Sequence, residues 1–144
     1  MIIRVEDEQR ANKCDELLTK LIRDEHQYDS TASLTFVVKD YFKNVIKDSN
    51  NVLLCFEEDN IIKGYVFFKP LTPNSKICFI DGLFVEEEYR KQGIASKLLE
   101  ETLKMVKKDY NYVEINVVRG NEAAYNLYKK LGFDDLRVTL RKTL

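Results

Sequence analysis

The sequence predicts an α/β protein with one β-sheet and one hydrophobic core. Apolar residues recur every three or four positions in some segments, as they do along one face of an amphipathic helix. Other segments are short apolar runs bounded by turn-forming residues, which is typical of strands. The two kinds of segment are interleaved along 144 residues, a length that supports one core, so we expect a single domain over residues 1–144.

The first third of the chain predicts a strand and two helices. The run from Ile2 to Val5 is the candidate strand. From about Gln9 to Glu25 the apolar residues follow helical spacing. Turn-forming residues between His26 and Ser33 interrupt that spacing, and it resumes from Val37 to about Lys47. We therefore expect a loop between the two helices.

The middle third predicts three strands. Val52 to Phe56 and Ile61 to Phe68 flank the turn-forming residues 57–60, a pattern that favours a hairpin. Ile77 to Val85 is the third strand, and Gly82 within it indicates a possible β-bulge.

The last third alternates helices and strands. A helix with an apolar stripe follows Gly93, and Tyr112 to Val118 is the next strand. Asn121 is a favourable N-cap for a helix from Glu122 to Leu131. We expect the run from Leu136 to Leu140 to form a last strand that closes the sheet.

The junction between the third of the middle strands and the following helix favours a bound anion. The first amides of a helix have no intrahelical acceptor and carry the positive end of the helix dipole. Gly93 lets the backbone approach a ligand closely, and Arg90 and Lys91 add positive charge. This loop is therefore suited to a pyrophosphate.

Two motifs resemble those of the GNAT superfamily of N-acetyltransferases. The spacing Arg90-x-x-Gly93-x-Ala95 after a strand is similar to the acyl-CoA pyrophosphate loop of that superfamily, and the block from Asn121 to Phe133 is similar to its C-terminal signature. Ala95 departs from the second glycine of many members, with no loss of function expected. The resemblance implies a single GNAT-like domain, with a mixed central β-sheet and helices on both faces.

The resemblance implies that acetyl-CoA is bound as a cosubstrate. Its pantetheine arm would lie beside the strand segment Leu83, Phe84 and Val85, with a main-chain N–H near Leu83 directed at the thioester oxygen. Asn121 is either only a helix cap or also a contact of the cofactor arm. The pyrophosphate would be held by Arg90, Lys91, Gln92, Gly93, Ile94, Ala95 and Ser96.

The resemblance also implies catalytic roles. Tyr128 matches the position of the tyrosine that protonates the leaving thiolate, although it could instead only pack in the core; Tyr125 is the alternative on the same helix. For the base, Asp81 is the first candidate, because an unpaired carboxylate on a central strand is costly unless a site uses it, and Glu114 is the second. No cysteine lies in either motif, so direct acetyl transfer within a ternary complex is expected.

The expected function is transfer of an acetyl group to a primary amine of a small-molecule or peptide acceptor, and the alternative is a non-catalytic acyl-CoA-binding or sensing domain. A formal net charge of −1 gives no reason to expect a nucleic-acid partner. The N-terminus lacks a signal-peptide core, and no apolar run is as long as a membrane span, so we expect a cytoplasmic protein.

The sequence leaves several properties of the protein undetermined. The three cysteines lack C-x-x-C spacing, so no metal site is expected. Asp24, Glu25 and Asp29 make the loop after the first helix acidic, which suits a cationic amine, but the amine itself has no readable signature. Dimers are common in the superfamily, so a homodimer is one open oligomeric state.

Overall fold

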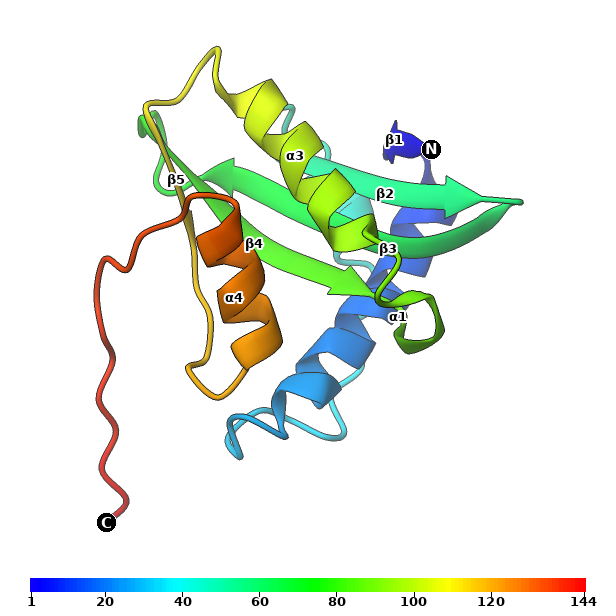
Figure 1. Cartoon of the computed structure of the whole chain (residues 1–144). Helices are drawn as coiled ribbons and strands as arrows, with labels where there is room; N and C mark the ends of the chain where they lie inside the picture. The colour runs from blue at the N-terminus through cyan, green and yellow to red at the C-terminus, as the bar shows by residue number, and fades with distance from the viewer.

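Five strands form one mixed sheet in the computed structural model of the chain, which describes all 144 residues (Figure 1). The spatial order equals the order along the chain. The first four strands pair antiparallel with their neighbours, and the fifth runs parallel to the fourth. The strands are β1 (Ile2–Arg4), β2 (Val52–Glu58), β3 (Ile61–Pro70), β4 (Ile77–Val85) and β5 (Tyr112–Ile115).

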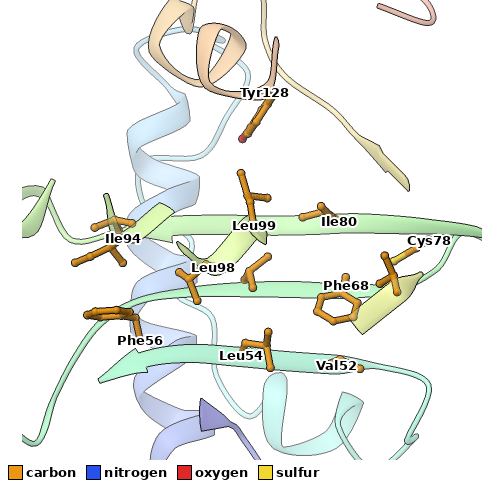
Figure 2. Close-up of a cluster of buried hydrophobic side chains, with 13 residues drawn as sticks. Val52, Leu54, Phe56, Phe68, Cys78, Ile80, Ile94, Leu98, Leu99 and Tyr128 are labelled. Carbon is orange, nitrogen blue, oxygen red and sulfur yellow. The ribbon is translucent and has the colours of Figure 1, made fainter. Parts of the chain in front are cut away.

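Helices cover both faces of this sheet (Figure 1). On one face, α1 (Glu8–Glu25) and the short α2 (Phe42–Val45) pack on a buried cluster with β2, β3 and β4. On the other face, α3 (Ile94–Val106) and α4 (Glu122–Lys130) cover a second cluster (Figure 2). The expected mixed sheet with helices on both faces is confirmed. None of the helices combines the length and apolarity needed to cross a bilayer.

The second helix is shorter than the predicted span from Val37 to Lys47. Asp40 adopts a positive φ of 57°, which interrupts helical geometry before α2. The carboxylate of Asp15, buried on α1, accepts hydrogen bonds from the N–H groups of Tyr41 and Phe42 at 3.3 and 3.0 Å. A contact from another helix therefore sets where α2 begins, and local periodicity does not.

The predicted closing strand from Leu136 to Leu140 is wrong. This segment has no regular secondary structure, and Leu136, Val138 and Leu140 are 68%, 81% and 90% exposed. Two side-chain ion pairs hold it instead: Arg137 to Glu114 at 3.3 Å and Arg141 to Asp29 at 2.7 Å. Alternating apolar residues make a strand only where a neighbouring edge pairs with their backbone, and β5 is only four residues long.

The predicted irregularity in β4 is a register shift next to Gly82. Phe67 on β3 pairs with Gly82, whereas Phe68 pairs with Ile80, so Asp81 has no partner on β3. The shift changes the alternation of the strand: Ile80, Leu83 and Val85 all pack in the cluster under α3 and α4, and Phe84 packs on the opposite face.

Tyr65 presents a hydroxyl to this bulge. The residue is fully buried, and its hydroxyl makes no hydrogen bond within the chain. A Cβ atom at position 82 would lie only 2.9 Å from that oxygen, so glycine is required there to make room for it.

We expect Tyr65→Phe to raise the free energy of unfolding by about 1 kcal/mol, because phenylalanine fills the same core space without an unpaired hydroxyl. Urea denaturation measures the change. Gly82→Ala should lower the free energy of unfolding more in the wild-type background than in the Tyr65→Phe background, because the latter lacks the clashing oxygen. A loss of stability in Tyr65→Phe would contradict this account of the hydroxyl.

Candidate active site

The site is built where β4 and β5 separate. Their parallel pairing ends at Ile80 with Ile115, whereas β4 continues to Val85 with no strand on that side. Figure 1 shows the chain after β5 turning away toward α4. The outer main-chain edge of residues 83–85 therefore has no neighbouring strand and can accept an extended ligand as an added strand.

The loop after β4 ends at an open helix N-terminus. Gly93 precedes α3 with a φ of +79°, and an added Cβ would meet no atom within 4 Å, so the space beside it is free. None of the loop hydrogen bonds uses the N–H groups of Lys91, Gln92 or Gly93. The first amides of α3, from Ile94 to Ser96, have no intrahelical acceptor. These predicted residues do come together as a group of unpaired donors.

The side chain of Arg90 is engaged differently. Its Nε donates to the carbonyl oxygen of Val85 at 2.8 Å, and its Nη2 donates to Asp24 on α1 at 2.9 Å. The guanidinium carbon also lies 5.2 Å from the centre of the Phe84 ring. Arg90 therefore links the loop to β4 and to α1.

Tyr128 lies on α4 and is buried, with its oxygen pointing toward the sheet (Figure 2). Its ring centroid is 6.0 Å from that of Phe133. The hydroxyl makes no hydrogen bond to another side chain, so the packing of the ring leaves this group without a side-chain partner. Burial, and to a lesser extent the negative charge of Glu25, raises the pKa of Tyr128 to about 12. The phenol is therefore neutral at physiological pH.

Glu25 is a further candidate base, which the sequence patterns did not indicate. It is the last residue of α1, is exposed as a whole residue, and makes no ion pair. Partial burial of its carboxylate, and then the charge of Asp29, raises its pKa. Its charge also contributes to the raised pKa of Tyr128, after burial, and to that of Tyr65, after burial and the charges of Cys14 and Asp81. The two tyrosines lie on opposite faces of the sheet. Glu25 thus lies within electrostatic reach of both phenols.

The acidic loop is less uniform than the sequence suggests. Asp24 is paired with Arg90, and Asp29 is paired with Arg141 at 2.7 Å. The hydrogen bond from Arg141 holds the pKa of Asp29 well below its usual range. Only Glu25 has no cationic partner. The sequence indicated the acidic cluster, but not which of its members lacks a cationic partner.

The two bases that the sequence suggested have other surroundings. The side chain of Asp81 is 37% exposed and lies 3.8 Å from Lys69, so the premise of a costly unpaired carboxylate is wrong. Glu114 is paired with Arg137 at 3.3 Å.

Two further side chains also have structural partners. The hydroxyl of Tyr125 donates to Asp135 at 2.8 Å, so this alternative acid is engaged elsewhere. Asn121 caps α4, because its side-chain oxygen accepts from the N–H of Ala124 at 3.2 Å. Its side-chain NH2 group is not used by the cap.

No group of three or more His, Cys, Asp or Glu side chains converges as a metal site.

Comparisons with known proteins agree with this architecture. The model of the acetyltransferase (GNAT) family matches residues 15–133. An N-alpha-acetyltransferase of Sulfurisphaera tokodaii is 32% identical over 111 residues, covering 68% of this chain and 65% of that protein. One from Saccharolobus solfataricus is 36% identical over 93 residues, covering 56% and 54%. The chain thus spans less than two thirds of the length of these relatives. A solved structure of a Bacillus halodurans protein has the same fold, with a TM-score of 0.80 and 19% identity over 100% of this chain and 99% of that one.

Proposed function

Because the chain belongs to the GNAT acetyltransferase family, we propose that it moves an acetyl group from acetyl-CoA to a primary amine by direct transfer in a ternary complex. The proposal is carried by four features of the elements around the end of β4, which the Arg90–Asp24 ion pair joins to the end of α1. These features are the open N-terminus of α3, the free edge of β4, the neutral phenol of Tyr128 and the unpaired carboxylate of Glu25.

Acetyl-CoA would supply an acetyl group activated as a thioester. The unpaired amides from Lys91 to Ser96 suit its pyrophosphate, with the backbone of Arg90 leading into them. The edge formed by Leu83, Phe84 and Val85 suits the pantetheine arm, and an N–H near Leu83 would bond the thioester oxygen. The free side-chain NH2 group of Asn121 would donate to the arm from the opposite side of the gap.

Glu25 would accept a proton from the attacking amine. A C–N bond forms at the acetyl carbon, the C–S bond breaks, and the N–H near Leu83 stabilises the oxygen that becomes negative in between. A carboxylate with a raised pKa is a better base than an ordinary one, because its proton affinity is closer to that of the group it serves. Asp81 stays as the second candidate for this role.

Tyr128 would assist departure of the thiolate. Its pKa of about 12 exceeds that of an ordinary thiol, roughly 8.5, so complete transfer of its proton to the thiolate is uphill. Protonation of Glu25 by the amine removes the charge that helps to raise the Tyr128 pKa, which makes the phenol a better donor at the moment of C–S cleavage. The Tyr128 O–H therefore stabilises the thiolate first by hydrogen bonding, and solvent completes the protonation.

The cysteines favour direct transfer over an acetyl-enzyme intermediate. Cys14, Cys55 and Cys78 are all buried. Burial raises the pKa of the Cys55 and Cys78 thiols to about 11, so neither is a ready nucleophile.

An α-amine, such as a peptide N-terminus, is the acceptor we propose to test first. Its ordinary pKa of about 8 leaves roughly a tenth of it neutral at pH 7, whereas a lysine amine is almost wholly protonated. A single unpaired carboxylate then suffices as the base. The names of the two archaeal relatives support the same choice.

Calorimetric titration of acetyl-CoA tests the donor site. We expect Gly93→Glu to weaken binding by at least about 100-fold, because its carboxylate repels the pyrophosphate beside the helix N-terminus. Gly132→Glu is a matched control: Gly132 also has a positive φ, of 93°, and also has free space for a Cβ, but it lies at the other end of α4 from Asn121. It should bind as the wild type does.

The same preparation distinguishes the alternatives. Binding followed by turnover of peptides from an amine panel supports the enzyme. Binding without turnover of any amine would favour a non-catalytic acyl-CoA-binding domain. No binding by the folded wild-type protein would refute both.

A further inference from the structure

Two ion pairs of opposite polarity join one side of α1 to the loop that precedes α3. Lys20 donates to Glu86 at 2.6 Å, and Asp24 accepts from Arg90 at 2.9 Å. Lys20 and Asp24 are four residues apart and so lie on the same side of the helix. Glu86 and Arg90 are the matching positions near the start and the middle of the loop.

Arg90 is the better anchored member of these pairs. Its Nε bonds the carbonyl of Val85 at 2.8 Å, and its guanidinium lies over the ring of buried Phe84. These contacts hold the Arg90 guanidinium in place independently of Asp24. Because two of its three nitrogens are already used within the chain, its side chain is committed to α1 and β4.

The partner of Arg90 is next to the proposed base. Asp24 and Glu25 are the last two residues of α1, and terminal helical turns fray unless something holds them. Directly after Arg90 comes the run of unpaired amides that suits the pyrophosphate. One arginine thus connects the backbone that would hold the donor to the helical turn that carries Glu25.

We propose that Arg90 is a positioning residue that couples the donor-binding loop to the end of α1 and thereby sets the place of Glu25. The proposal rests on the function proposed above for that loop and for Glu25. It assigns the pyrophosphate to the backbone amides that follow Arg90, and it assigns the Arg90 side chain to Asp24.

The pair is partly exposed, with side-chain accessibilities of 40% for Arg90 and 43% for Asp24. Exposed ion pairs contribute little to global stability. Breaking this one should therefore leave the melting temperature nearly unchanged and act on local geometry. A small displacement of a catalytic group is enough to slow a reaction substantially.

The test compares Asp24→Asn, Arg90→Lys and the double variant. We expect each to lower kcat by about tenfold, with the Kd for acetyl-CoA within about twofold of the wild-type value. The double variant should be no slower than the slower single variant, because each single variant already disrupts the Arg90–Asp24 pair. Glu16→Gln is the control: it removes one charge from an exposed position of α1, where Glu16 pairs only with Lys13.

Three results would overturn the inference. One is weaker acetyl-CoA binding in Arg90→Lys with Asp24→Asn unaffected, which would make Arg90 a phosphate ligand. The second is losses in kcat that multiply in the double variant. The third is an Asp24→Asn variant with the kcat of the wild type.

Amide hydrogen exchange separates this inference from the proposed function. Asp24→Asn should raise exchange by about threefold both in the last turn of α1 and in residues 86–93, whether or not any amine is turned over. Unchanged exchange in the loop would contradict the coupling. A wild-type protein that binds no acetyl-CoA, or acetylates no amine, would refute the proposed function and leave the exchange result to decide the coupling alone.

Discussion

Glu25→Gln is expected to lower kcat by about 100-fold with little change in the Kd for acetyl-CoA. Glutamine keeps the size and position of the side chain but accepts no proton from the attacking amine. Steady-state kinetics with a peptide acceptor, together with calorimetry for the donor, measure the two quantities. Asp81→Asn and Glu114→Gln are the matched controls, and each should lower kcat much less than Glu25→Gln does. A larger loss in Asp81→Asn would transfer the role of base to Asp81.

The pH profile gives an independent reading of Glu25. Partial burial and the charge of Asp29 raise its pKa, so the acid limb of kcat/KM should have its midpoint above the ordinary glutamate value of about 4.3. Activity falls as pH decreases through this midpoint, because the protonated carboxyl is no base. In Glu25→Gln this limb should be absent. An identical acid limb in the variant would assign it to another group.

Stability should change in the opposite direction to activity. A carboxyl whose pKa is raised by folding stabilises the folded state below its unfolded-state pKa, and this contribution is lost as pH rises through the folded-state pKa. At pH 7 the ionised Glu25 therefore destabilises the folded state, and Glu25→Gln should have a slightly higher melting temperature. A residue that costs stability and supports turnover is typical of an active site.

Tyr128→Phe is expected to lower kcat by about 100-fold while the Kd for acetyl-CoA stays within about twofold. Phenylalanine keeps the buried ring and its packing on Phe133, and removes only the O–H that would bond the departing thiolate. Because the core contact is preserved, the melting temperature serves as a check that the variant is folded.

Tyr125→Phe is the matched control for Tyr128→Phe. It removes a hydroxyl from the same helix, but one that is exposed and already donates to Asp135. We expect its kcat to stay within about threefold of the wild-type value. If Tyr128→Phe were equally active, the phenol would have only a packing role.

Local patterns were sufficient where neighbouring residues alone decide the structure. The strand from Ile77 to Val85, the bulge beside Gly82 and the cap at Asn121 follow from alternation, from the freedom of glycine and from side-chain hydrogen bonding within one turn. The run from Leu136 to Leu140 has the same alternation but no strand edge to pair with, so the pattern alone misled.

The sequence by itself determined the order of the main helices and strands, the loop at Gly93 and the helix that carries Tyr128, because these depend on short-range spacing. The tertiary structure decided which charged groups are paired. Arg90 and Asp24 are 66 residues apart, and Arg141 and Asp29 are 112 apart. Chain folding brings each pair within hydrogen-bonding distance and leaves Glu25, which lies between Asp24 and Asp29 in the sequence, without a cationic partner. Burial and such distant neighbours set the pKa of an ionisable group. The sequence alone therefore did not indicate Glu25 as a candidate base.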